Sequence, residues 1–257
     1  MQDIAAIIAG AGAGTRLGAN LPKALVECGG SPLIVHAVRG MRVAGIENIV
    51  VTVPLSWQTE FSTALQRAGL EVQIVIGGNT RQESVANALA VIDTKYVLVH
   101  DAARAFTPPE LIRSVTEALK AGTNAVIPAL PVIDTIKRGH IENESGRRKR
   151  IVATATLKRE ELYAVQTPQG FSRELLLSAH AHGNAFAATV ENAATDDAAL
   201  IELLGESVEI LPGDARALKI TTPFDLEIAE LLAKKDCHTE IRMQISPGDL
   251  EHLNIPE

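Results

Sequence analysis

The stretch "DIAAIIAGAGAGTRLGANLPKAL", residues 3–25, decides the fold class of this 257-residue chain. Its opening part, "DIAAIIA", is nearly all apolar, which predicts a strand buried on both faces of a sheet. Gly10, Gly12, Gly14 and Gly18 follow directly and favour a tight loop, because glycine adopts backbone conformations that other residues avoid. The stretch therefore indicates a parallel sheet covered by helices, with a loop of unusual composition at the end of its first strand.

The same alternation of short β-branched runs and amphipathic stretches continues along the chain. Further strands are predicted at 48–53, 71–77, 96–101, 124–130 and 207–213. Helices are predicted at 31–45, 57–69, 81–92, 107–122, 175–183, 196–205 and 222–235. We therefore expect an α/β fold, with a Rossmann-like, mostly parallel twisted sheet and helices on both faces.

Sequence signals also predict where three of these helices begin. Ser31 is expected to cap the first, with Pro32 at its first position. Thr107 is expected to cap the helix at 107–122, with Glu110 completing a capping box. Thr222 is expected to cap the last helix.

In sheets of this kind, ligands bind beyond the carboxyl ends of the strands. Four predicted loops lie at such ends, at 9–18, 77–81, 101–106 and 130–137. These loops are where a functional site is expected.

The alternation stops between about 132 and 160, where a polar and charged middle is flanked by short strand-like pieces. This pattern predicts a solvated, projecting β-hairpin that could dock onto a second subunit. The chain otherwise reads as one domain over 1–235, followed by a tail at 236–257 with no strong period.

Composition excludes several classes of protein. The 24 Lys and Arg residues against 31 Asp and Glu give a net charge of −7, which argues against a nucleic-acid-binding protein. No apolar run approaches the length of a membrane span, and no leader peptide is evident at the N-terminus. The two cysteines, Cys28 and Cys237, are far apart, which favours a reduced, cytoplasmic setting.

The glycine-rich loop matches neither of the two familiar nucleotide fingerprints. It lacks the G-x-G-x-x-G spacing of dinucleotide-binding proteins and the Gly-Lys pair of a Walker P-loop. What remains is a glycine turn followed by Arg16 and by Pro22-Lys23. The two cations could hold different phosphates of a triphosphate, or they could be solvated charges beside an ordinary turn.

A resemblance to a known family makes the first alternative specific. "AGAGAGTRLGANLPKAL" resembles the signature loop of the nucleotidyltransferases that activate sugar phosphates. Six more segments in register resemble the 2-C-methyl-D-erythritol 4-phosphate cytidylyltransferase family from about residue 4 to 232: "GGNTRQESVANAL" (77–89), "VLVHDAARAF" (97–106), "PVIDTIK" (131–137), "REELYAVQTPQGF" (159–171), "TDDAAL" (195–200) and "ALKITTPFDL" (217–226). Departures from the usual family pattern, at Ala9, Gly10, Asn79, Ala105 and Ala217, remove no charged catalytic position.

The resemblance implies a reaction and a set of residues for it. The acceptor phosphate would attack the α-phosphorus of CTP, with Arg16 and Lys23 stabilising the transition state. Arg159 and Lys219 would present the acceptor phosphate. Nucleotide binding is implied for Gly10, Ala11, Gly12, Gly14, Gly78, Asn79, Ser84, Asp101 and Ala102. Acceptor binding is implied for Thr135, Arg159, Thr167, Thr195, Lys219 and Thr221.

The resemblance also implies a cofactor and an assembly. Mg²⁺ would be held mainly by the CTP phosphates, with Asp101 as a candidate ligand. The projecting β-arm would join two chains into a homodimer and complete the partner's site. His100 is expected to be a packed strand residue rather than a base.

Three other functions compete with this one. A cytidylyltransferase for a pentitol phosphate such as ribitol 5-phosphate would share the CTP loops. A catalytically silent nucleotide-binding module would keep the fold, but the retained cations Arg16, Lys23, Arg159 and Lys219 argue against it. A dehydrogenase is disfavoured by the missing dinucleotide fingerprint.

Overall fold

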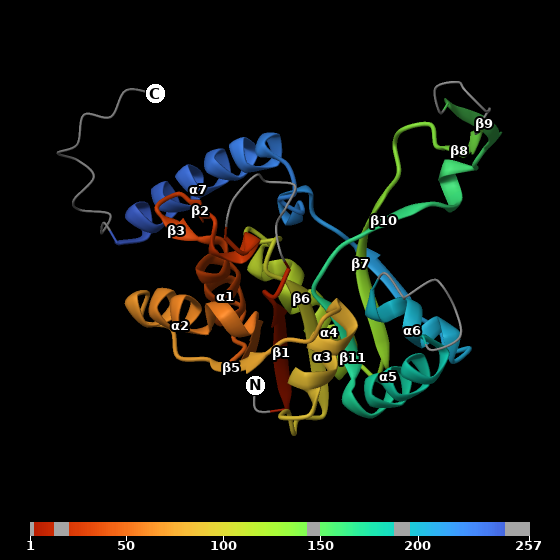
Figure 1. Cartoon of the computed structure of the whole chain (residues 1–257). Coiled ribbons are helices and arrows are strands. Elements are labelled where there is room, and N and C mark those ends of the chain that lie inside the picture. Colours follow the sequence, from red (N-terminus) through yellow and green to blue (C-terminus); the bar gives the residue numbers. More distant parts are fainter. Residues whose placement is uncertain (1–2, 13–20, 143–149, 188–195, 245–257) are drawn as a thin grey trace.

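One large sheet organises the molecule (Figure 1). The computed structural model describes residues 3–12, 21–142, 150–187 and 196–244. The strands run in the order β10-β7-β11-β6-β1-β4-β5, and β12 pairs with β7. Their bounds are β1 Ile4–Ala9, β4 Asn48–Val53, β5 Gln73–Ile76, β6 Tyr96–Asp101, β7 Ala125–Pro131, β10 Tyr163–Val165, β11 Gln169–Ser172 and β12 Glu209–Pro212.

The sheet is mostly parallel, as predicted. β1 pairs in parallel with both β4 and β6, β4 with β5, and β12 with β7. β11 is antiparallel to both of its neighbours, β6 and β7, and β10 is antiparallel to β7. The β11 strand comes from the "TPQGF" segment, for which no strand was predicted.

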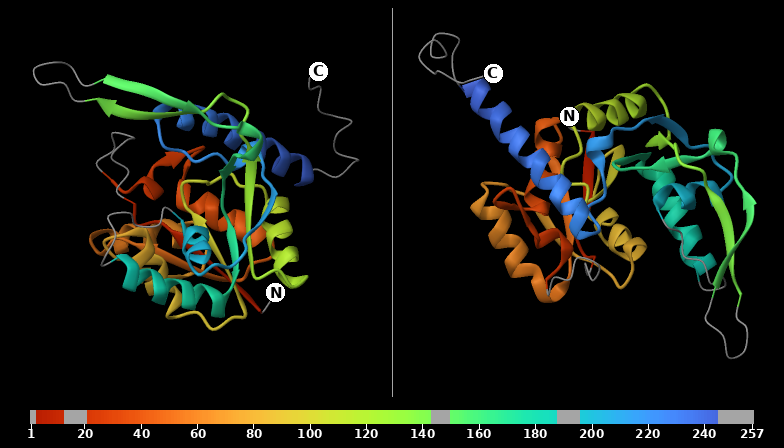
Figure 2. Two further views of the ribbon diagram at one scale, coloured as in Figure 1. Left: turned by 90° about the vertical axis from the view of Figure 1, so that its right-hand side faces the viewer. Right: turned by 90° about the horizontal axis from the view of Figure 1, so that it is seen from above.

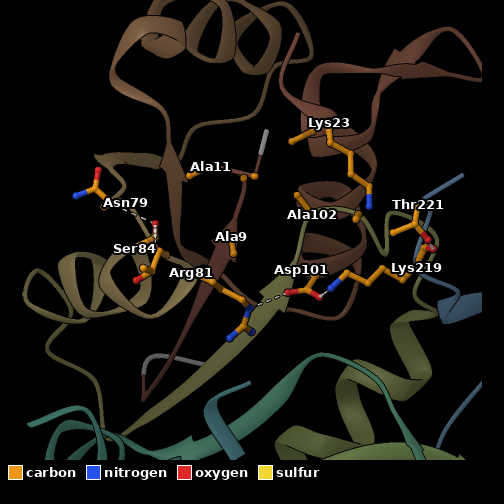
Figure 3. A pocket seen from close by; sticks show the side chains of 16 residues that line it. Ala9, Ala11, Lys23, Asn79, Arg81, Ser84, Asp101, Ala102, Lys219 and Thr221 are labelled. Atoms are coloured by element: carbon orange, nitrogen blue, oxygen red, sulfur yellow. Dashed lines mark hydrogen bonds and ion pairs between the residues drawn. The ribbon is translucent and has the colours of Figure 1, made fainter. Parts of the chain in front are cut away.

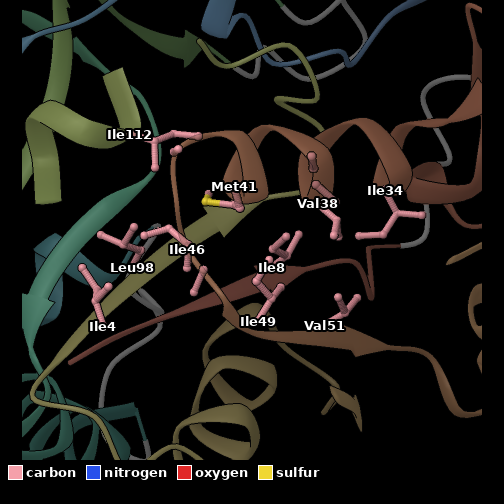
Figure 4. Close-up of a cluster of buried hydrophobic side chains, with 14 of the residues drawn as sticks. Ile4, Ile8, Ile34, Val38, Met41, Ile46, Ile49, Val51, Leu98 and Ile112 are labelled. Carbon is pink, nitrogen blue, oxygen red and sulfur yellow. The ribbon is translucent and has the colours of Figure 1, made fainter. Parts of the chain in front are cut away.

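Helices cover both faces of the sheet, and the alternation of side chains along β1 shows why. Ile4 and Ile8 point into one core, with helices α1, α2 and α4 (Figure 4). Ala5 and Ile7 point into the other, with α3, α5 and α6. Because both faces of the strand are buried, nearly every residue in it is apolar. The helices span α1 Leu33–Val43, α2 Gln58–Arg67, α3 Arg81–Leu89, α4 Pro109–Lys120, α5 Arg173–Ala187 and α6 Asp197–Leu203.

A smaller cluster joins the C-terminal helix α7, Pro223–Gln244, to the region after the glycine-rich loop. Cys28 and Leu33 pack there against Ile220 and Ala229. Two short strands, β2 Glu27–Cys28 and β3 Ser31–Pro32, form the turn beneath the helix. Helix α7 does not end at Lys235 as expected, since it continues to Gln244; residues 245–257 of the expected tail lie outside the described residues.

The projecting hairpin is present. Strands β8, Lys137–Glu142, and β9, Arg150–Thr156, pair with each other and stand clear of the large sheet (Figures 1 and 2). Their side chains are almost all exposed. Within the described ranges, no helix has the length and apolar character needed to span a membrane.

Two of the predicted helix caps are wrong. Ser31 lies in β3, and Pro32 occupies the cap position of α1. Pro108 takes the cap of α4, while the Thr107 hydroxyl donates to Arg104 O and makes no capping box. Proline fixes φ at these two cap positions, and no side chain of the cap residue accepts a hydrogen bond from the first turn of either helix. Thr222 does cap α7, where its hydroxyl accepts from the Asp225 N–H.

Candidate active site

A cavity of about 460 Å³ opens beyond the carboxyl ends of β1, β5 and β6 (Figure 3). Three of the four loops predicted to carry a site contribute to it, and the fourth, at 130–137, leads into the projecting arm. The lining residues are Ala9, Gly10, Ala11, Gly12, Lys23, Ala24, Gly78, Asn79, Thr80, Arg81, Ser84, Asp101, Ala102, Ala103, Lys219 and Thr221. The structure thus brings together segments that lie far apart in the sequence.

The glycine-rich loop forms one wall of the cavity. The Gly10 N–H donates to Thr52 O at 3.0 Å, which ties the start of the loop to the end of β4. A Cβ atom on Gly10 would lie 2.9 Å from that same oxygen and 3.1 Å from the Phe61 ring, so only glycine fits. The Lys23 N–H donates to Gly12 O at 3.4 Å, which brings Lys23 back to the cavity.

The loop between β5 and α3 forms the opposite wall. The Ser84 hydroxyl accepts from the Gly78 N–H at 3.0 Å and donates to Thr80 O at 2.8 Å. The Asn79 N–H donates to the Glu83 carboxylate at 2.7 Å. Ser84 and Glu83 therefore hold the glycine turn in shape, and the Ser84 hydroxyl is already engaged within the protein.

A carboxylate between two cations marks the floor of the cavity. Asp101 Oδ1 lies 3.2 Å from Arg81 Nε, and Asp101 Oδ2 lies 2.8 Å from Lys219 Nζ. Burial alone would raise the pKa of Asp101, but the charges of Arg81 and Lys219 hold it well below its usual range. Asp101 is therefore ionised throughout the physiological pH range.

Arg81 is the functional residue that the sequence reasoning missed. It is the first residue of α3, it lines the cavity, and its Nη1 atom also lies 2.6 Å from Asp197 Oδ2. Burial disfavours its charge, yet the two carboxylates together raise the pKa of Arg81 above its usual value. The signal was a cation at the last position of the predicted 77–81 loop, where the predicted helix at 81–92 begins.

The segment that carries Lys219 is held from two directions. Arg104 donates to Ala217 O at 2.7 Å and to Val165 O at 3.0 Å. Burial alone would raise the pKa of Asp225, but the hydrogen bonds that it accepts from Thr221 and Thr222 together lower it to about 2. The Thr221 hydroxyl lies 2.8 Å from this carboxylate, so Thr221 shapes the turn as well as lining the cavity.

A smaller cavity of about 210 Å³ adjoins the first and shares Arg81, Asp101 and Lys219 with it. Thr167 is part of its wall, but its hydroxyl accepts from the Asp101 N–H at 3.1 Å and contacts His100 Nδ1 at 2.9 Å. Burial lowers the pKa of His100 to about 4. The structure thus places His100 as a neutral, packed strand residue, as predicted.

Two expected site residues lie away from both cavities. Arg159 and Thr135 are exposed at the base of the arm, and Arg159 Nη1 donates to Ile133 O at 3.0 Å. Neither residue lines a cavity of its own chain. Arg16, Gly14 and Thr195 lie outside the described residues.

The donor set at the site fits a magnesium ion only in part. Asp101 is the one carboxylate among the described residues that line the larger cavity. The described ranges hold no cluster of three or more His, Cys, Asp or Glu side chains suited to a metal. Mg²⁺ commonly binds through one carboxylate, several waters and substrate phosphates, so Asp101 suits such an ion if the phosphates supply the other ligands.

Comparisons with known proteins agree with this geometry. The profile of the 2-C-methyl-D-erythritol 4-phosphate cytidylyltransferase family matches residues 4–235. A protein of that name from Rhodococcus jostii is 46% identical over 237 residues, covering 91% of this chain and 97% of that protein. The corresponding protein from Nocardia farcinica is 46% identical and covers 90% of this chain and 94% of its own length.

Solved structures show the same similarity in three dimensions. The crystal structure of 2-C-methyl-D-erythritol 4-phosphate cytidylyltransferase from Thermus thermophilus superposes with a TM-score of 0.71 at 34% identity, covering 89% of this chain and 98% of that one. The 4-diphosphocytidyl-2C-methyl-D-erythritol synthase from Anaerococcus prevotii gives 0.73 at 27% identity, covering 91% and 96%. Both superpositions cover about nine tenths of this chain and nearly all of the solved structure.

Proposed function

The chain belongs to the 2-C-methyl-D-erythritol 4-phosphate cytidylyltransferase family, and from that premise we propose how its residues divide the work of the reaction. The enzyme transfers CMP from CTP to 2-C-methyl-D-erythritol 4-phosphate, giving 4-diphosphocytidyl-2-C-methyl-D-erythritol and pyrophosphate, in non-mevalonate isoprenoid precursor synthesis. The observation that best supports the division of roles is the single cavity that gathers the glycine loop, Lys23, Asp101 and Lys219.

The glycine loop and the loop after β5 are proposed to hold CTP. The Gly10 N–H already donates to Thr52 O, but the backbone N–H groups of Ala11 and Gly12 suit a polyphosphate, because no side chain larger than a methyl group stands beside them. Gly78 and Asn79 face them across the cavity and suit the cytosine and ribose, with Ser84 fixing the turn. Lys23 lies between the two walls, where its charge would stabilise the transition state and the leaving pyrophosphate together with Arg16.

The attacking group needs no general base, because a phosphate monoester is already anionic at neutral pH. Catalysis then depends on aligning the acceptor oxygen with the α-phosphorus and on neutralising charge. Lys219 is proposed to bind the acceptor phosphate, and its position between the two cavities supports this role. Thr167 and Thr221 are proposed to shape the acceptor site, since their hydroxyls are engaged within the protein.

Magnesium is proposed as the cofactor. It would be held by the triphosphate, with Asp101 as its protein ligand, and would supply further charge neutralisation on the phosphates. The support is the chemistry of the donor set, a single carboxylate at the floor of the cavity.

Arg159 and Thr135 are proposed to serve the site of a second copy of this chain. Both lie at the base of the projecting arm and away from the cavities of their own chain, which supports a homodimer with shared sites. A cytoplasmic location is proposed as well. Its support is Cys28, a free and buried thiol.

Release of pyrophosphate from CTP and Mg²⁺, measured with each candidate acceptor, tests the function. Turnover with 2-C-methyl-D-erythritol 4-phosphate and little with ribitol 5-phosphate is expected. Turnover with ribitol 5-phosphate alone would reassign the acceptor. CTP binding without turnover on either acceptor would identify a silent nucleotide-binding module.

A further inference from the structure

A line of four buried or half-buried charged and polar side chains runs from the floor of the cavity into the core. Asp101 contacts Arg81, Arg81 contacts Asp197, and Asp197 Oδ1 lies 2.9 Å from His180 Nε2. His180 belongs to α5, Asp197 begins α6 and Arg81 begins α3. His180 and Asp197 themselves line neither cavity, although Gln169 and Asp196, which adjoin Asp197, line the smaller one.

We propose that His180 is a positioning residue for cytidylyl transfer, which acts by fixing Asp197 and through it the guanidinium of Arg81. The inference rests on the proposed function, because it concerns how the floor of that active site is held. His180 touches no substrate and takes no part in the chemistry.

The first argument is burial. Asp197 is 1% exposed and His180 is 3% exposed, so neither can turn to water for a hydrogen bond. Burial raises the pKa of Asp197, but the hydrogen bond from His180 and the charge of Arg81 outweigh it and leave the pKa lowered. Asp197 is therefore an anion whose two oxygens have different partners, and removing either partner leaves a buried charge half satisfied.

The second argument is geometry. Arg81 has a long, flexible side chain, and its planar guanidinium is held at one end by Asp197 and at the other by Asp101. His180 fixes the rotation of the Asp197 carboxylate by holding Oδ1, so that Oδ2 faces Arg81 at 2.6 Å. Gln169 contributes weaker contacts from the other side, where its Oε1 accepts the Asp197 N–H at 3.2 Å.

The third argument is the hydrogen bonding of the imidazole itself. Within the described residues, His180 Nδ1 has no hydrogen-bond partner, although it is buried. Leaving a buried polar atom unpaired costs free energy, so a residue chosen only for packing would be apolar here. Among the described residues, the hydrogen bond to Asp197 is therefore what accounts for a polar side chain at this buried position.

The consequence for the reaction follows from Lys219. Arg81 and Lys219 hold the two oxygens of Asp101 from opposite sides. If Arg81 is no longer held by Asp197, Asp101 can move together with Lys219. Lys219, the proposed ligand of the acceptor phosphate, then has no fixed position. Displacement of a positioned group by about 1 Å can cost about 100-fold in rate, and loss of one indirect contact is expected to cost less, about 10-fold.

Two amide substitutions of His180 distinguish a positioning role from a role in core packing alone. The amide of His180→Gln reaches the position of Nε2 and can donate to Asp197, whereas the shorter His180→Asn cannot. We expect His180→Asn to lower kcat about 10-fold with a KM for CTP within about twofold of the unmodified enzyme. His180→Gln should recover kcat to within about threefold. The exposed His182→Gln, on the same helix, is the matched control.

A double-mutant cycle with Arg81→Gln completes the test. If His180 acts through Arg81, adding His180→Asn to Arg81→Gln lowers kcat no further. Equal losses in His180→Asn and His180→Gln, full activity in His180→Asn, or additive losses in the cycle would each overturn the inference. Absence of turnover by the unmodified chain on either acceptor would instead overturn the proposed function, and the inference with it.

Discussion

Lys219 Nζ and Asp101 Oδ2 lie 2.8 Å apart, so the loop after β12 is fastened to the end of β6 at the floor of the cavity. The contact joins the segment that is proposed to hold the acceptor to the strand that carries the nucleotide site. Arg81 completes the arrangement on the other oxygen of Asp101. Three charged groups with one net positive charge therefore sit where phosphates are expected to meet.

Asp101→Asn should remove both the anchor of Lys219 and the proposed ligand of Mg²⁺. The amide leaves Arg81 and Lys219 facing each other without a neutralising charge, so Lys219 loses its fixed position. We expect kcat to fall by about 10- to 100-fold at both low and saturating Mg²⁺, since added metal does not restore the position of Lys219. Steady-state pyrophosphate release measures kcat under both conditions. Asp93→Asn, at an exposed carboxylate between α3 and β6, is the control, and an unchanged kcat in Asp101→Asn would contradict the role given to the contact.

Lys23→Ala should abolish most turnover while leaving the fold intact. Lys23 is half-buried at the cavity, where its charge is proposed to stabilise the transition state. Loss of one such group typically lowers kcat by about 100- to 1,000-fold. Kinetics and thermal unfolding are measured together, with Lys120→Ala, an exposed cation at the end of α4, for comparison. Near-normal turnover at an unchanged melting temperature would remove Lys23 from the mechanism.

Much of the fold could be predicted because the hydrophobic pattern of most segments matches their burial in the folded protein. The buried run at Ile4–Ala9 has no polar face, so it could only be an inner strand. The antiparallel strand β11 was not predictable in the same way. Gly170 lies in it, where a Cβ would come within 2.6 Å of Val115, so the strand's identity depends on close packing with α4 rather than on its own propensity.

Site residues at the ends of strands could be predicted from the sequence. Site residues whose position depends on ion pairs with distant residues could not. Gly10, Gly78 and Asp101 lie at strand ends or within two residues of them, and the structure brings them to one cavity. Arg81 depends on Asp101 and on Asp197, which is 116 residues further along, and no local pattern reports such a contact. Whether Arg159 reaches an active site depends on a second chain, which is a property that one sequence does not encode locally.

Stability should fall as the pH is lowered from about 7 to 5, in part because of His100. Burial lowers the pKa of His100 to about 4 in the folded protein, against about 6.5 when unfolded. As the pH falls, the unfolded chain therefore binds the proton before the folded protein does. By pH 5, His100 lowers the free energy of unfolding by about 2 kcal/mol. Chemical unfolding at the two pH values measures the loss. His100→Gln should show a smaller loss than the unmodified protein, whereas exposed His140→Gln on the arm should not differ; identical pH dependence in all three would contradict the assignment.

Mixing two inactive variants should reveal whether Arg159 works in the partner's site. Arg159 lies on the arm, outside both cavities of its own chain, whereas Lys23 and Lys219 line one cavity together. In a randomly reassociated mixture of Arg159→Ala and Lys23→Ala chains, half of the dimers are mixed, and each mixed dimer holds one intact site. The mixture should then recover about a quarter of the activity of the unmodified enzyme. A mixture of Lys219→Ala and Lys23→Ala is the matched control. It should stay inactive, because both residues line the same cavity, so each chain lacks one lysine of its own site. If the first mixture is as inactive as the second, Arg159 does not act across a dimer.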